Sequence, residues 1–232
     1  QGAEALNAWD VPYYSEKLRL AKYDLSQEQL RPYFPAEKVI EGMFAVVKRL
    51  FAIDIETVTD FESYHPDVRF YQINQDGEPI ARFYLDLFAR EKKRGGAWMA
   101  DCRVRRINKG QLQLPVAYLT CNFSPPSADT PSLLTHDEVT TLFHEFGHAL
   151  HQMLSNVRYE SISGTSVARD FVELPIQLYE HWLEVPEVLG EFATHAETGA
   201  PMPPELLRKV LGFALIALRM SRSGSKGQIA SL

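Results

Sequence analysis

Cysteine is scarce in this chain, which has only Cys102 and Cys121 among its 232 residues. Two cysteines are too few for the disulfide framework of a small secreted protein, so we expect free thiols in a reducing compartment and a cytoplasmic location. Long apolar runs are also missing, because none approaches the roughly 20 residues that span a bilayer. The sequence therefore predicts no membrane-spanning segment.

The sequence also has few clusters of positively charged residues. The formal net charge is −6, and the basic run "AREKKRGG" is interrupted by Glu91. Nucleic acids and anionic membranes favour surfaces with clustered Lys and Arg. The charge balance argues against both as partners, and we interpret the basic run as a solvated turn.

The first residues, "QGAEALNAWDVPYY", lack an initiator Met and the basic and apolar regions of a signal peptide. We therefore expect the chain to be a processed or excised piece of a longer protein.

The remaining composition, 45% hydrophobic and 23% charged, is that of an ordinary globular protein. Residues 10–53 have a helical pattern, in which the apolar positions of one predicted helix recur at intervals of three and four. Residues 68–123 contain short aromatic and β-branched runs separated by "QDGEP", "KRGG" and "NKGQ", which are typical of turns. The helical pattern returns over residues 135–211. These periods predict a mainly α fold with a small antiparallel sheet, in the α+β class, and a flexible tail at 212–232.

The stretch "TLFHEFGHALHQML" carries the candidate chemistry. Thr135 followed by Glu138 fits a capping box and predicts a helix that begins near His136. His144 and His148 are four residues apart, so they project from one face of that helix, one turn apart. Two imidazoles in this arrangement can bind a single Zn²⁺.

Glu145 lies about 100° round the helix from His144, beside a metal rather than on it. There its carboxylate could accept a proton from metal-activated water. Gly147 is expected to keep the neighbouring surface open. The alternative to a metal site is that the pattern arose by chance. In a chain with seven histidines, an H-E-x-x-H pattern would arise by chance with a probability on the order of a percent.

A third ligand has to come from elsewhere in the chain. His151 lies about 10 Å along the axis from His144, which favours packing or contact with a ligating imidazole over metal binding. The metzincin pattern needs Gly at 151 and His at 154, and the sequence has His151 and Leu154. That class of metalloprotease is excluded.

A carboxylate from the next predicted helix is the remaining option. Glu173 stands between Val172 and Leu174, where an unpaired carboxylate would be costly and a metal would remove the cost. Asp170 is a candidate to accept a hydrogen bond from a ligating histidine, with a surface ion pair to Arg169 as the alternative. The predicted apolar face of this helix is made up of Phe171, Leu174, Leu178 and Trp182, and Pro175 either kinks the helix or starts its regular part.

These residues resemble a known family. "LFHEFGHALH" followed by "SGTSVARDFVELPIQLYEHW" is similar to the zinc core of the M3 peptidases, the thimet oligopeptidase family, and "FYLDLFAREKKRGGAWM" and "LPVAYLTCNF" extend the likeness over residues 9–211. The resemblance implies a partial peptidase catalytic region at 1–211, of zincin type, with the H-E-x-x-H helix beside the sheet. It implies one Zn²⁺ per chain, bound by His144, His148 and Glu173, with Glu145 as general base and short peptides as substrates.

The family pattern also has parts that this sequence lacks. Family members carry a large helical region before the equivalent of Gln1, and a Gly- and Tyr-rich substrate-binding segment after the equivalent of Gly212. We therefore hold open a second function, a catalytically impaired zinc-binding fragment or interaction module, and a third, a helical scaffold without metal. Surfaces that the missing parts would cover lead us to expect self-association.

Overall fold

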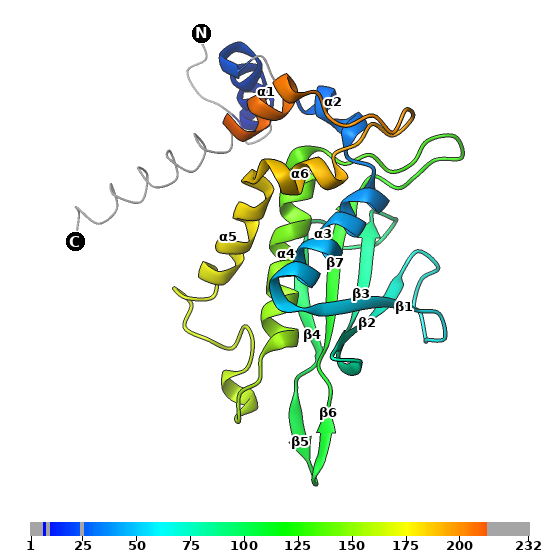
Figure 1. The fold of residues 1–232 in the computed structure, drawn as a ribbon, viewed down its shortest axis with the longest axis vertical. Helices are drawn as coiled ribbons and strands as arrows, with labels where there is room; N and C mark the ends of the chain where they lie inside the picture. The colour runs from blue at the N-terminus through cyan, green and yellow to red at the C-terminus, as the bar shows by residue number, and fades with distance from the viewer. Residues whose placement is uncertain (1–6, 8–9, 24–25, 213–232) are drawn as a thin grey trace, which may run out of the picture.

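The computed structural model describes residue 7 and residues 10–23 and 26–212. Most of the predicted tail, 213–232, lies outside the described residues. The fold is α+β, as predicted (Figure 1). A five-stranded sheet has the order β1-β2-β3-β7-β4, and a two-stranded sheet is formed by β5 and β6. No helix of the described part is long and apolar enough to cross a membrane.

The first quarter of the chain is helical and then enters the sheet. Its elements are α1 (Asp10–Tyr23), α2 (Gln27–Leu30), a 3-10 turn (Arg31–Tyr33), α3 (Ala36–Phe51) and β1 (Ile53–Val58). Val39, Met43, Val46 and Val47 are buried, as the spacing predicts, and Leu50 is half-buried. Strand β1 is a correction, since sequence analysis placed the first strand after residue 67. Ala52, in the left-handed region with φ 53°, ends α3 and turns the chain at once into β1.

The remaining strands are β2 (Arg69–Gln75), β3 (Glu78–Phe88), β4 (Trp98–Arg103), β5 (Arg106–Asn108), β6 (Gln111–Gln113) and β7 (Val116–Phe123). Two of the predicted turns are two-residue hairpin turns, Asp76–Gly77 and Lys109–Gly110, with positive φ at all four residues. Positive φ at both central positions is typical of the type I′ turn, which suits the twist of the strands.

The sheet is mixed, which corrects the antiparallel expectation. Strands β3 and β7 pair in parallel, from Arg82↔Val116 to Phe88↔Phe123, and the other pairs of the five-stranded sheet are antiparallel. Parallel neighbours need a long crossover, here the excursion through β4, β5 and β6. The sequence pattern could not predict this pairing, because the alternation of apolar residues along a strand is the same beside a parallel and an antiparallel neighbour.

The second helical region covers one face of the sheet. It contains α4 (His136–Leu154), a 3-10 turn (Glu160–Ile162), α5 (Leu174–Glu180), a second 3-10 turn (His181–Glu184), α6 (Pro186–Phe192) and a helix over 204–212. Helices α3 and α4 meet the sheet through Phe44, Phe83 and Phe146, whose rings lie within 6.1 Å of one another. Helix α6 packs on α3 at Gly42, where a Cβ would lie 2.3 Å from Phe192. The core therefore lies between the sheet and these helices.

The predicted apolar face around α5 is wrong. Its members are all exposed: Phe171 47%, Leu174 49%, Leu178 59% and Trp182 36%. The helix begins only at Leu174, with Pro175 in its first turn, and becomes a 3-10 turn at His181. The stretch 168–187 therefore does not form one long regular helix, and the side facing the core is formed by Ile176, Tyr179 and Leu183.

Candidate metal centre

Helix α4 is held in place at its start and along one side. Thr135 Oγ1 accepts from the Glu138 N–H at 3.1 Å and the Glu138 carboxylate accepts from the Thr135 N–H at 2.7 Å, so the predicted capping box is present. Phe143, Phe146 and Ala149 are fully buried on the core side. The opposite side, which carries His144 and His148, is left facing α5.

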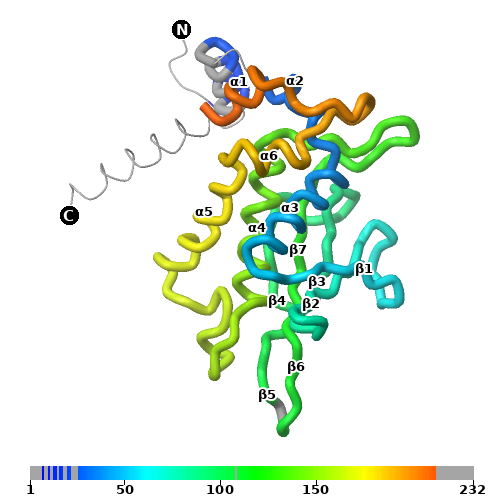
Figure 2. Tube along the Cα trace, in the orientation of Figure 1, coloured from blue at the N-terminus to red at the C-terminus, as the bar shows by residue number. Residues whose placement is uncertain are grey.

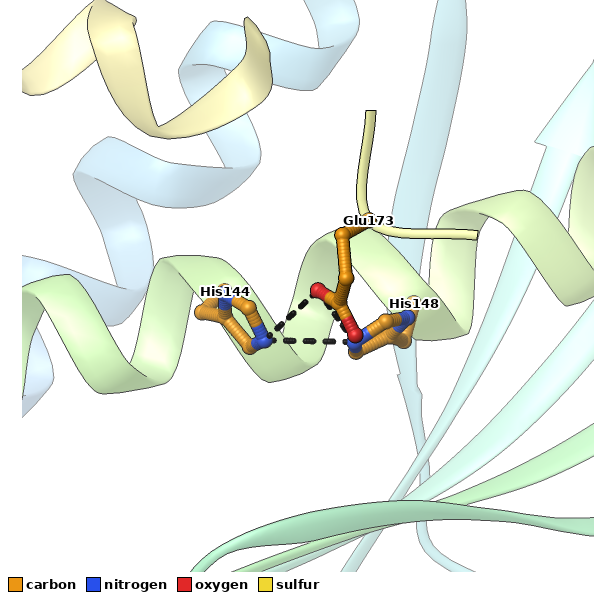
Figure 3. Close-up of side chains that lie close together, drawn as sticks. All are labelled: His144, His148 and Glu173. Atoms are coloured by element: carbon orange, nitrogen blue, oxygen red, sulfur yellow. Dashed lines mark hydrogen bonds and ion pairs between the residues drawn. The ribbon is translucent and has the colours of Figure 1, made fainter. Parts of the chain in front are cut away.

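The structure brings the three predicted ligands together (Figure 3). His144 Nε2 and His148 Nε2 are 3.2 Å apart, and Glu173 Oε2 lies 3.5 Å from each of them. Three ligand atoms held at ~2.0–2.1 Å from a tetrahedral zinc ion are themselves about 3.3 Å apart. The observed spacings therefore fit a single zinc-sized ion without movement of the backbone.

Glu173 reaches this point because α5 approaches α4 closely. It stands immediately before α5, and its carbonyl accepts from the Gln177 N–H at 2.9 Å. Gly147 is buried under α5, and a Cβ there would lie 3.1 Å from Ile176 Cγ2 and 3.4 Å from Tyr179 Cδ1. The expectation that Gly147 keeps the surface open is wrong: the glycine instead lets α5 pack close to α4.

Glu180 contributes to the centre and was missed by sequence analysis. Its Oε1 is hydrogen-bonded to His144 Nδ1, the ring nitrogen that does not face Glu173. This hydrogen bond, opposed by burial, raises the pKa of His144. Carboxylates that orient a metal-binding imidazole in this way are a common feature of metal sites. The signal was the spacing, since Glu180 follows Glu173 by two helical turns.

Glu145 lies between α4 and the edge of the sheet. Burial raises the pKa of its carboxyl, while the neighbouring His144 and a hydrogen bond from the Met99 backbone act in the opposite direction. Met99 belongs to β4, whose only partner among the described strands is β7. The carboxylate thus lies near His144 and next to a strand whose second edge has no partner among the described strands.

The other two candidates are placed differently. His151 lines an apolar cavity of about 240 Å³ with Phe51, Leu154 and Tyr179, and burial lowers its pKa. Its Nδ1 is buried without a hydrogen-bond partner among the described residues. Asp170 is exposed in the turns before α5. The described structure shows no hydrogen bond from either side chain to His144 or His148.

Comparison with known proteins places the site in a family. The model of peptidase family M3 matches residues 1–222. The chain belongs to this family. This M3 chain is 52% identical to oligopeptidase A of Escherichia coli, over 96% of its own length and 34% of the relative's. It is 44% identical to a dipeptidyl carboxypeptidase of the same organism, over 93% of its length and 32% of the relative's.

A plant relative extends the range. The M3 chain is 43% identical to the organellar oligopeptidase A of Arabidopsis thaliana, over 97% of its length and 29% of the relative's. The chain thus spans about a third of the length of the curated relatives it matches. The predicted family resemblance is confirmed. One Arabidopsis relative is named organellar and another is named a probable cytosolic oligopeptidase A, so the relatives do not decide the location. The cytoplasmic location of this chain stays a prediction.

Proposed function

We propose that this chain is the catalytic region of a zinc-dependent metallopeptidase that hydrolyses short peptides. The observation that carries the proposal is the cluster of His144 Nε2, His148 Nε2 and Glu173 Oε2, with Glu145 beside it. Two imidazoles and one carboxylate are typical of catalytic zinc sites, which keep one position open. Membership of family M3 supports the same chemistry.

His144, His148 and Glu173 would hold the ion, and Glu180 would fix the ring of His144 through Nδ1. Zinc bound in this way lowers the pKa of water to about 7 and polarises a carbonyl oxygen. Two further tasks are proposed for groups of this chain, the transfer of the proton and the alignment of the substrate.

Glu145 is the group that moves the proton. Its carboxylate takes a proton from the attacking water and returns it to the leaving amine, the two tasks of a general base and then general acid. Burial raises its pKa, which makes it a better base than an exposed carboxylate. The hydrogen bond from the Met99 backbone fixes its position relative to β4.

Strand β4 is proposed to align the substrate. Among the described residues its free edge has no partner strand, so an extended peptide could join it by main-chain hydrogen bonds. Such pairing is tolerant of sequence, which suits an enzyme for varied short peptides.

The test combines metal analysis with a quenched-peptide assay on the 232-residue chain. We expect one zinc per chain, removed by chelation, and hydrolysis that returns when zinc is restored. Glu145→Gln should retain the zinc while activity falls by roughly 10²- to 10⁴-fold, the usual contribution of a positioned general base. Full activity in Glu145→Gln would exclude Glu145 from the mechanism.

The same experiment separates the alternatives. Stoichiometric zinc without hydrolysis in the wild-type chain would favour the impaired zinc-binding module. Absence of zinc, with the chain folded by circular dichroism, would favour the metal-free scaffold and overturn the proposal.

A further inference from the structure

A cleft lined by arginines lies at the far end of β4 from the candidate metal centre. Its volume is about 910 Å³, and its walls are residues 105–107 after β4 and residues 156–161 after α4. Arg105, Arg106 and Arg158 contribute the positive charge. A second opening of about 570 Å³ shares Arg106 and adds Arg103. The basic run "RVRRINK" thus forms one wall of a groove, although sequence analysis singled out only "AREKKRGG".

The positive charge of this cleft is poorly neutralised. No acidic residue occurs between Asp101 and Asp129 in a chain whose net charge is −6. Within the described structure, the one ion pair in the cleft is Arg106 Nη1 to Glu160 Oε2, at 3.6 Å. Arg105 and Arg158 have no carboxylate within ion-pair distance among the described residues, although Arg158 stacks over Tyr159 at 5.5 Å. Guanidinium groups left in this state favour a carboxylate ligand.

The cleft is continuous with the proposed substrate path. Strand β4 (Trp98–Arg103) carries Met99, beside Glu145, near its start, and the chain continues from its end through Val104 to Arg105. Figure 2 shows α4 running alongside β4 toward the β5–β6 hairpin, so that both walls of the cleft follow elements that leave the metal centre. At about 3.3 Å per residue, the six positions from Met99 to Arg105 span roughly 20 Å.

From this geometry we infer that the arginine cleft binds an acidic side chain of the peptide lying along β4, about four to six residues from the bond that is cleaved. The inference rests on the proposed peptidase function and deepens it, because it makes the cleft a determinant of specificity. A carboxylate held by Arg105 and Arg158 would fix the peptide against β4, and the main-chain pairing alone carries no such preference.

The experiment uses two series of internally quenched peptides built on alanine and glycine. One series carries a single Glu at successive positions, and the other carries Gln at the same positions. The ratio of kcat/KM for each Glu–Gln pair should peak when the residue lies about four to six positions from the cleaved bond. The preference should weaken at high salt, because exposed charge pairs are screened.

Two sets of variants assign the preference to the cleft. Arg105→Gln and Arg158→Gln should each reduce the Glu–Gln ratio by up to roughly fivefold, the scale of an exposed ion pair. Hydrolysis of the Gln peptides should change less than hydrolysis of the Glu peptides. Arg208→Gln is the control, since it removes one exposed positive charge from the helix over 204–212.

Binding to Glu145→Gln, followed by fluorescence anisotropy with labelled Glu and Gln peptides, tests the inference without turnover. If the wild-type chain hydrolyses no peptide, but the Glu peptide binds Glu145→Gln more tightly than the Gln peptide and loses this advantage when Arg105→Gln is added, the proposed function fails and the cleft assignment holds. Equal binding of Glu and Gln peptides, no binding of either, or a preference that survives both cleft substitutions would overturn it. Such a result would mean that the arginines of the cleft contact something other than the peptide substrate.

Discussion

Helix α4 and the segment Ser155–Glu184 supply the candidate metal centre in very different ways. Helix α4 is 19 residues long, has a capping box, and buries an unbroken apolar side against the sheet. The later segment consists of turns, two 3-10 turns and the seven-residue α5, with seven large apolar side chains exposed. Two histidines therefore come from a rigid support, and Glu173 and Glu180 come from one with little packing of its own.

The difference suggests that the two parts of the site differ in how much of their stability comes from their own packing. Short helices are marginal by themselves and depend on tertiary contact. Helix α5 is held on one side only, where Ile176 and Tyr179 are buried against α4 and the ring of Tyr179 stacks on Phe143 at 5.5 Å. A metal that joins both supports would stabilise the weaker one, because a ligand that binds only the folded state adds to its stability.

The largest expected effect comes from the core side of α4. Phe146→Ala removes a fully buried ring that packs on Phe83 and Phe44, and should cost about 3–5 kcal/mol of unfolding free energy. Phe171→Ala, in the segment before α5, removes a ring that is 47% exposed and should stay within about 0.5 kcal/mol. Urea unfolding of the two variants measures the difference, and equal losses would remove the contrast between the two supports.

Metal affinity gives the next largest effect. Glu173→Gln keeps the shape of the side chain but should weaken zinc binding by more than about 100-fold, beyond the usual loss for a partner outside the ligand set. Asp170→Asn, three residues earlier and exposed, is the matched control and should bind zinc as the wild type does. Competition with a chelator gives both constants. Loss of zinc in the control, with Glu173→Gln unaffected, would reassign the third ligand.

A smaller effect is expected at Glu180. Glu180→Gln weakens the hydrogen bond to His144 Nδ1 without removing a ligand, so zinc affinity should fall by roughly 10- to 100-fold. Glu184→Gln, which changes the 3.2 Å contact with His181 instead, serves as the control. If the two variants bind zinc equally well, Glu180 has no part in holding the ring.

The smallest expected effect concerns the sheet, whose stability should depend on pH through a buried carboxyl group. Asp86, at the end of β3, is buried and is held by Arg90 at 2.7 Å and Lys93 at 2.8 Å. Burial acts to raise the pKa of Asp86, but the hydrogen bonds from Arg90 and Lys93 outweigh it and leave the pKa below its usual value. A depressed carboxyl pKa stabilises the fold above the unfolded-state value, near 3.9, and this contribution is lost as the pH falls through the folded-state pKa.

Arg90→Gln should therefore begin to lose stability at a higher pH than the wild type during acid titration. Lys93 stays in place, so the displacement of the acid transition should be modest. Thermal unfolding measured between pH 6 and pH 2.5 checks this. Superimposable curves would show that Arg90 does not control Asp86.

Local sequence patterns predicted helix α4 correctly but did not predict the structure of the segment 155–184. The capping box and the spacing of Val139, Phe143 and Phe146 are properties of adjacent residues, so α4 could be placed from sequence alone. The face of α5 depends on where the helix starts and ends, and Pro175 and the 3-10 turn at His181 displaced it. The spacing put Glu180 two helical turns after Glu173, but the hydrogen bond that Glu180 accepts from His144 Nδ1 is a tertiary relation that no local period encodes. The direction of β7 relative to β3 is another such relation.

The parallel pairing of β3 with β7 also affects the order in which the chain can fold. Strand β4 precedes β7 in the chain but pairs only with β7 among the described strands, so it cannot join the sheet until β7 has done so. Helix α4 needs only local contacts and can form in microseconds, whereas closing Arg82 onto Val116 must first overcome the entropy of the intervening loop. The hydrogen bond from Met99 to Glu145 therefore becomes possible only when the sheet is complete. During refolding, helical circular dichroism should rise before peptide hydrolysis does.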